Sequence, residues 1–126
     1  MNALRGALGG LSLLYALVFL TFGLLHAGIG VGPLREPVIV PAAVVETLCA
    51  GAMLAGAYGA LSGRRWAWDG LIYAHACALG GVLLGILALA FGPVAGTALL
   101  TWYHSAMAVV LTAGLTGAFY VSRVRR

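Results

Sequence analysis

The stretch LSLLYALVFLTFGLLHAGIG, residues 11–30, contains no acidic or basic side chain except His26. A helix that crosses the hydrocarbon core of a bilayer needs about 20 predominantly apolar residues. Three similar stretches follow, and the four predicted helices cover residues 8–30, 38–61, 69–91 and 95–121. None of them contains Arg or Lys. With 63% hydrophobic and 8% charged residues, the chain has too much apolar surface for a soluble domain of this size.

Short connections join these four segments, and short connections make neighbouring helices run antiparallel. Gly32-Pro33 follows the first segment and Gly92-Pro93 follows the third, as residues that end helices do. We therefore predict an all-α fold, an integral membrane antiparallel four-helix bundle. Residues 1–126 are expected to form a single transmembrane domain.

The positions of the arginines predict the orientation of the bundle. If all four helices span, the N-terminus, the second connection and the C-terminus lie on one side of the membrane. All of the arginines except one lie in these segments: Arg5, Arg64, Arg65, Arg123, Arg125 and Arg126. Only Arg35, beside Glu36, lies on the other side. Because positive charge is retained on the cytoplasmic face, both termini are predicted to be inside.

The net charge of +4 is explained by this topology and by the anionic lipid of the inner leaflet, which attracts basic segments. We therefore expect no nucleic-acid partner; the expected partners are the lipid bilayer and either further copies of the chain or a larger membrane complex. Small residues that permit close backbone contact are expected to pack the helices. They recur at short helical intervals as Gly9, Ser12, Ala16, Gly23, Ala27 and Gly30 in the first helix and as Ala74, Ala78, Gly81, Gly85 and Ala88 in the third.

Three ionisable side chains inside the predicted spans, His26, Glu46 and His104, fall at similar depth in the outer half of the bundle. An ionised carboxylate that faces lipid is costly, so Glu46 should face the interior, where the two histidines are the available partners. Two imidazole nitrogens and a carboxylate oxygen could bind Zn²⁺ or Fe²⁺. The cluster could instead carry a proton or bind the polar head group of a ligand. The structural alternative is that the three side chains hydrogen-bond one another and fix the register of the helices.

The fourth helix is expected to present a polar face to this site. Its polar residues at helical spacing are Thr101, His104, Ser105, Thr112 and Thr116. His26 and His104 are also the only matched pair of histidines, and two histidines on different helices at one depth could ligate a haem.

His75 in the third helix is a candidate for a secondary site in the inner half. Tyr15 in the first helix lies at comparable depth and could hydrogen-bond it. The competing interpretation is structural, because a lone histidine on an apolar helix more often has a packing role.

Cys49 and Cys77 are the two cysteines, and they form no CxxC pair. Thioredoxin-like and zinc-knuckle sites therefore have no support. Both are expected to be buried free thiols that pack as small hydrophobes, with a redox pair as the alternative.

Two stretches resemble a known family of membrane proteins. FLTFGLLHAG, residues 19–28, resembles the F-x-x-H-G-type first helix of DoxX-like proteins. Residues 46–65, from Glu46 through two glycines to Arg64-Arg65, resemble that family's E-x-G-x-G stretch ending in basic residues. The resemblance implies a small four-helix bacterial membrane protein, linked in some members to quinone or oxidative-stress partner complexes.

The sequence favours one function and leaves two others open. The favoured function is a small polytopic protein of the bacterial inner membrane whose His26–Glu46–His104 cluster handles a proton, a metal ion or a quinone-like ligand within a membrane complex. The first alternative is a proton-coupled exporter resembling small multidrug transporters, although their single intramembrane glutamate is usually in the first helix. The second is a structural accessory subunit. Whether the protein is an enzyme, and which of quinone, metal and haem it would hold, is left open by the sequence alone.

Overall fold

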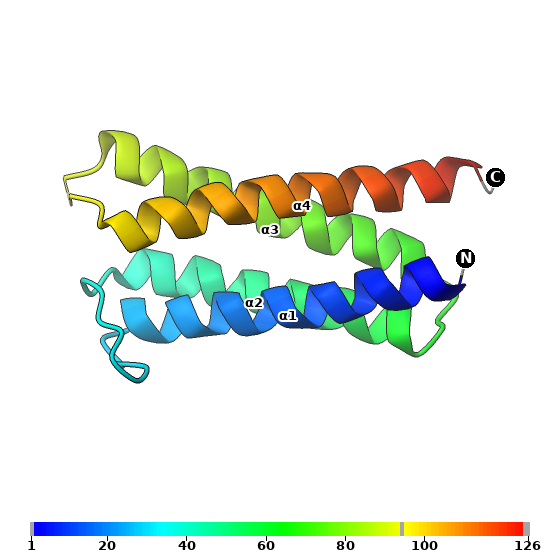
Figure 1. Ribbon diagram of the computed structural model, residues 1–126, viewed down its shortest axis with the longest axis horizontal. Helices are drawn as coiled ribbons and strands as arrows, with labels where there is room; N and C mark the ends of the chain where they lie inside the picture. The colour runs from blue at the N-terminus through cyan, green and yellow to red at the C-terminus, as the bar shows by residue number, and fades with distance from the viewer. Residues whose placement is uncertain (1, 94, 125–126) are drawn as a thin grey trace.

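The computed structural model describes residues 2–93 and 95–124, which form four long α-helices. The helices are α1 (Asn2–His26), α2 (Val40–Leu61), α3 (Ala67–Phe91) and α4 (Ala98–Val124). Each runs antiparallel to the one before it (Figure 1). The start of α1, the α2–α3 connection and the end of α4 lie at one end of the bundle. We call the opposite end, which carries the α1–α2 and α3–α4 connections, the distal end.

The predicted all-α arrangement of four helices is confirmed for the described residues. All four helices are long and apolar enough to cross a membrane, which is consistent with a multi-pass membrane protein. The direction of crossing stays a prediction, and it rests partly on Arg125 and Arg126, which lie outside the described residues.

The first helix ends at His26, before the predicted end at residue 30. Gly28 has a φ of +89°, a left-handed conformation that favours glycine. The N–H of Gly28 donates to the Leu25 carbonyl, and the N–H of Ile29 donates to the Leu24 carbonyl, both at 2.9 Å. This is a Schellman motif, which satisfies the last carbonyls of a helix and turns the chain away. His26 is therefore the last residue of α1, beside the chain that leads to α2.

Small residues bring the backbones of α1, α2 and α3 close together. On α1, Gly9, Ser12, Ala16 and Gly23 are buried as predicted, whereas Ala27 and Gly30 lie beyond the helix and are exposed. A Cβ added at Gly9 would lie 3.0 Å from the Cβ of Ala60 in α2. A Cβ added at Gly56 would lie 2.8 Å from the Cβ of Ala74 in α3. Both distances are shorter than ordinary contacts, so the helices approach this closely only because glycine is present.

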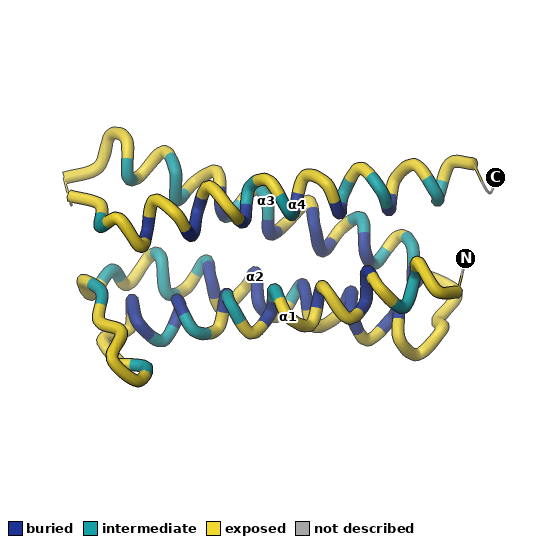
Figure 2. The backbone as a smooth tube through the Cα atoms, viewed as in Figure 1, coloured by how far each residue is buried: buried dark blue, intermediate teal, exposed yellow. Residues whose placement is uncertain are grey.

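α4 meets α1 through large aromatic side chains. The ring of Tyr103 stacks on Phe22 with a centroid separation of 3.7 Å and an interplanar angle of 7°. It meets Phe19 edge-on at 6.3 Å. Figure 2 shows that the buried residues of the helices face the interior of the bundle. Many of the exposed residues are large and apolar, a pattern typical of a surface that faces lipid.

The prediction that α4 presents a polar face to the interior is wrong, except for His104. Thr101, Ser105, Thr112 and Thr116 are exposed. Three of their hydroxyls donate to carbonyls one turn earlier: Thr101 to Thr97 at 3.2 Å, Thr112 to Ala108 at 2.7 Å and Thr116 to Thr112 at 2.8 Å. A hydroxyl that is satisfied on its own helix needs no partner in the core, so these residues can face outward at little cost.

Candidate functional site

The candidate site begins with a buried contact between the last residue of α1 and the second turn of α2. Nδ1 of His26 lies 2.7 Å from Oε2 of Glu46, and the two residues are 1% and 5% exposed. The backbone holds these helix ends together, because the N–H of Ile39 donates to the His26 carbonyl at 2.9 Å. Two of the three predicted site residues are therefore in direct contact.

The hydrogens of this pair follow from its surroundings. An apolar interior strongly disfavours net charge, so the pair is neutral overall, as imidazolium with carboxylate or as imidazole with carboxylic acid. When the carboxyl group carries no hydrogen other than the one shared between Nδ1 and Oε2, the second hydrogen of the pair is on Nε2 of His26. That Nε2 is buried and has no hydrogen-bond partner among the described residues. In that arrangement the site contains an unused N–H donor.

His104 in α4 supplies the opposite chemistry. Its Nδ1 lies 2.8 Å from the carbonyl oxygen of Leu100, and a carbonyl can only accept, so Nδ1 carries the hydrogen. Nε2 of the neutral ring is then an acceptor. This side of the ring lies against Gly85 of α3, where any Cβ would overlap the imidazole. Gly85 thus makes the room that the His104 ring occupies.

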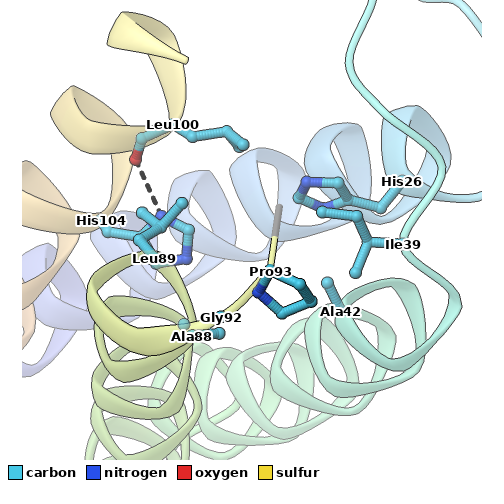
Figure 3. A pocket seen from close by; sticks show the side chains of 10 residues that line it. His26, Ile39, Ala42, Ala88, Leu89, Gly92, Pro93, Leu100 and His104 are labelled. Carbon is cyan, nitrogen blue, oxygen red and sulfur yellow. Dashed lines mark hydrogen bonds between the residues drawn. The ribbon is translucent and has the colours of Figure 1, made fainter. Parts of the chain in front are cut away.

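An apolar cavity of about 240 Å³ lies between the two imidazoles. Figure 3 shows His26 and His104 on opposite sides of it. Its other walls include Ile39, Ala42, Leu89, Pro93 and Leu100. The two imidazoles are the only side chains in this lining with nitrogen or oxygen atoms. A ligand held there would contact apolar groups on most of its surface and polar nitrogens at two points.

A second cavity of about 280 Å³ adjoins the first and shares Gly85 and His104 with it. It lies between α2 and α3 and reaches Glu46. Pro41 and Leu84 in its lining are exposed, so it opens toward the outer surface of the bundle. We call the two cavities together the α2–α3 groove. Each cavity alone is slightly smaller than the small-molecule sites of other proteins, which range from roughly 300 to 1,000 Å³.

The contacts at the site do not fit the metal centre that the sequence left open. Within the described part of the chain, no group of three or more His, Cys, Asp or Glu side chains is placed to hold a metal ion. His26 and Glu46 hold each other, and Nδ1 of His104 holds the Leu100 carbonyl. Haem fits no better, because a porphyrin bridging the two histidines would have to enter a cavity of about 240 Å³.

The sequence interpretation missed Tyr103. Its hydroxyl interacts with the carboxyl group of Glu46, and its ring lies 4.7 Å from the His104 ring. A buried tyrosine usually finds a partner for its hydroxyl, and that rule was the available signal. Which partner it finds depends on the rotation of α4 about its axis, and the sequence does not fix that rotation.

The two distal connections are joined by their side chains. The Thr97 hydroxyl lies 3.1 and 3.0 Å from the carboxylate oxygens of Glu36 and accepts the N–H of Leu100 at 3.1 Å. Glu36 is thus held at the N-terminus of α4, where the helix dipole favours a carboxylate. Ile39 and Pro93, next to these contacts along the chain, line the first cavity. The Thr97–Glu36 contact therefore lies within a few residues along the chain of two residues in the distal wall of the groove.

The rings of His75 and Tyr15, the candidate secondary site, are in contact, and the hydrogen bond that the sequence left open between them is not formed. The ring centroids are 6.2 Å apart at 86°. Nδ1 of His75 donates to the Leu71 carbonyl at 2.8 Å, and Nε2 has no partner among the described residues. The ring packs on Gly114 of α4, where a Cβ would meet it. Because His75 is fully enclosed, the contacts support a packing role.

Cys49 is buried and Cys77 is exposed, and both are free thiols. The predicted burial is confirmed for Cys49 and wrong for Cys77. The inward face of α3 at this level is formed by Ala74 and Ala78, which are buried, and Cys77 lies at the edge of that face, where it is exposed. The alternative of a redox pair has no support, because only one of the thiols enters the core.

Comparison of the chain with protein-family models, with curated proteins and with solved structures finds no match. The resemblance of residues 19–28 and 46–65 to DoxX-like proteins therefore stays a prediction. The buried pair and the groove are left as the basis for a functional conclusion.

Proposed function

We propose that this protein binds a lipid-soluble, quinone-like ligand in the α2–α3 groove and that the His26–Glu46 pair exchanges a proton with an oxygen of that ligand. The observation that carries the proposal is the buried, unpartnered Nε2 of His26 beside an apolar cavity. Leaving a buried donor unpaired costs about 1–3 kcal/mol. A ligand oxygen at this wall would satisfy the donor and recover that free energy.

The proton exchange moves one hydrogen at each of the two ring nitrogens of His26, Nε2 and Nδ1. Nε2 gives its hydrogen to the ligand oxygen, and the hydrogen held between Nδ1 and Oε2 of Glu46 settles on Nδ1. Glu46 is then a carboxylate, and Tyr103, which interacts with it, can donate to it. The reverse movement takes the proton back. The pair therefore acts as an acid when it gives the proton, which leaves it with one negative charge, and as a base when it takes the proton back and becomes neutral again.

The walls of the groove suit a ligand that arrives from the bilayer. Apart from the two imidazoles and Glu46, its lining is apolar. Its mouth, at Pro41 and Leu84, lies on an exposed surface of α2 and α3, which would face lipid if the helices span. A polar solute from water would lose its hydration there and regain few hydrogen bonds. A flat, apolar molecule with oxygen atoms at its edge would lose little.

The proposal extends to the setting of the protein. We place it in the bacterial inner membrane with both termini in the cytoplasm, surrounded by lipid and either self-associated or bound in a membrane complex that supplies any electrons. The resemblance to DoxX-like proteins supports this setting and the quinone class. No nucleic-acid partner is proposed.

Single-cysteine labelling tests the orientation. In a background without Cys49 and Cys77, a membrane-impermeant thiol reagent should label Arg35→Cys from outside the cell. Arg64→Cys and Val124→Cys should be labelled only after the membrane is opened. The opposite pattern would reject the proposed orientation but would leave the ligand proposal intact.

The alternatives account for less of the geometry. A pair that only fixes helix register explains the 2.7 Å contact but not an unused donor beside a cavity. A proton-coupled exporter needs a glutamate that is free to bind a cation in place of its proton, whereas Glu46 is buried and held by His26. A purely accessory subunit needs neither the pair nor the groove.

Direct binding tests the proposal. The protein in lipid nanodiscs would be dialysed against decylubiquinone and, separately, against its reduced form, decylubiquinol. We expect wild type to bind at least one of them and His26→Leu to lose about tenfold or more in affinity. Ser105→Ala, an exposed change on α4, should bind as wild type does. Thermal unfolding of each variant separates lost binding from lost folding, and no binding of either compound by folded wild type would reject the proposal.

A further inference from the structure

The geometry points to selection between two forms of the ligand: the α2–α3 groove prefers a reduced, dihydroxy aromatic head group to the oxidised diketone. This inference rests on the proposed function and adds the hydrogen-bonding class of the substrate. It follows from the hydrogens of the two imidazoles that face each other across the cavity, His26 and His104.

The wall formed by His104 accepts a hydrogen bond and does not donate one. Its Nδ1–H is committed to the Leu100 carbonyl at 2.8 Å. If the hydrogen moved to Nε2, two acceptors would face each other at that distance. The neutral ring therefore keeps its hydrogen on Nδ1 and presents a lone pair at Nε2. Gly85 leaves room for the ring in this position, because a Cβ at residue 85 would overlap the imidazole.

The neutral form of His104 is the one that its neighbours favour. The groups facing it are His26 from α1, Glu46 from α2 and Tyr103 beside it in α4. The charge of Glu46 is already balanced within its pair with His26. A further proton on His104 would leave an unbalanced positive charge in an apolar groove, which is costly.

The opposite wall of the cavity, formed by His26, donates a hydrogen bond. Nε2 of His26 carries a hydrogen when the His26–Glu46 pair shares its other hydrogen between Nδ1 and Oε2, and it has no partner among the described residues. A ligand that bridges the cavity must therefore accept from His26 and donate to His104. A hydroquinone can do both, since each hydroxyl accepts and donates. A quinone has only carbonyl oxygens at these positions, and one of them would face the lone pair of His104 with no hydrogen between.

The test compares affinities for decylubiquinol, kept reduced under anaerobic conditions with dithionite, and for decylubiquinone. The protein is the full chain in nanodiscs at neutral pH. We expect the quinol to bind about tenfold more tightly, the effect of one buried acceptor left without its hydrogen bond. His104→Gln supplies an amide that both donates and accepts. Binding should therefore persist, and the variant should bind the quinol and the quinone about equally.

His75→Gln is the matched control. His75 is the other histidine of the α3–α4 pair, has the same hydrogen bond to a carbonyl one turn earlier and lies outside the lining of the groove. This variant should keep the wild-type preference for the quinol. Melting temperatures of both variants show that the compared proteins are folded.

Each outcome separates the two proposals. A quinol preference that disappears in His104→Gln and survives in His75→Gln supports the inference. Equal binding of both forms, or tighter binding of the quinone, overturns the inference and leaves the proposed function standing. A preference for the quinol that survives in His104→Gln also overturns the inference, because His104 would then not be the residue that distinguishes the two forms. Binding of neither form by wild type removes the proposed function and the inference together.

Discussion

Two histidines of the α3–α4 pair are held in the same way and differ in what lies beside them. His104 of α4 packs on Gly85 of α3, and His75 of α3 packs on Gly114 of α4. Each donates from Nδ1 to the carbonyl one turn earlier, at 2.8 Å. The same number of residues separates the histidine from the glycine on each helix. The antiparallel pair thus contains the same histidine–glycine contact twice.

The surroundings of the two contacts differ. The His75 ring is fully enclosed, with Tyr15 edge-on to it. The His104 ring borders the α2–α3 groove and faces the His26–Glu46 pair across it. The same hydrogen bond to a carbonyl is therefore found in a packed histidine, His75, and in a histidine that borders a candidate ligand site, His104. What distinguishes a site here is empty volume with a second polar group beside it, and the histidine alone does not indicate a site.

The largest effect is expected from replacing Glu46, because its pair with His26 lies across the groove from His104 and has no counterpart beside His75. Glu46→Leu leaves Nδ1 of His26 without its partner, which costs about 1–3 kcal/mol of stability, and abolishes proton exchange with the ligand. Glu46→Gln keeps shape and hydrogen bonding, so the fold should be retained while proton exchange is lost. Thermal unfolding and ligand-linked proton uptake in weakly buffered nanodiscs measure the two effects. A Gln variant that exchanges protons as wild type does would leave only the register-fixing role for the pair.

The next effect is expected at the two glycines that hold the histidines. In Gly114→Ala the new Cβ would meet the enclosed His75 ring, at 2.6 Å from its Cδ2. Overpacking of this kind costs about 1–3 kcal/mol, partly offset by about 1 kcal/mol of helix propensity. In Gly85→Ala the His104 ring can move into the groove, so stability should fall less and affinity for decylubiquinol should fall more. Parallel measurements of unfolding and binding check this, and equal effects of the two changes would contradict the comparison.

The sequence predicts most of what depends on position along the helix axis. The helices follow from apolar length, and His26 and Glu46 could be matched because depth in a span is counted from residue numbers. Small residues such as Gly9 also predicted close contacts, because their spacing of three and four residues repeats along the helix and requires no knowledge of which neighbour the helix faces. The end of α1 differed by only a few residues, because the left-handed Gly28 terminates it.

The sequence predicts much less of what depends on the rotation of a helix about its own axis. The threonines of α4 were expected inside and are exposed, while Tyr103 faces the core beside His104. Cys77 was expected inside for the same reason. Rotation is set by the packing of large side chains, here Phe22 against Tyr103, and these contacts join distant parts of the chain. The groove is a product of that packing and has no signature in the sequence.

A smaller effect is expected from closing the groove at its wall, and two adjacent alanines of α2 provide the comparison. Ala42 lines both cavities of the groove, whereas Ala43 lines a separate surface hollow between α1 and α2. Both are partly buried. Ala42→Trp should reduce the affinity for decylubiquinol about tenfold by filling the site, and Ala43→Trp should change it little. Equal loss in both variants would mean that the ligand binds elsewhere.

The smallest effect is expected at the distal wall, where Thr97 joins the two connections. Thr97→Val keeps the shape but loses the hydrogen bonds to Glu36 and to the N–H of Leu100. Loss of a helix cap costs about 0.5–2 kcal/mol. Thr112→Val is the control, because that hydroxyl is exposed and bonds only within α4.

If the Thr97–Glu36 contact supports the groove, Thr97→Val should also release decylubiquinol faster in stopped-flow dissociation, whereas Thr112→Val should not. The contact lies outside the lining of both cavities, so its influence on the ligand must act through Ile39 and Pro93. Unchanged dissociation with lowered stability would assign Thr97 to the capping of α4 alone. The distal wall would then owe its position to the packing of the helices, as the contact of His75 with Gly114 does at the other end of the α3–α4 pair.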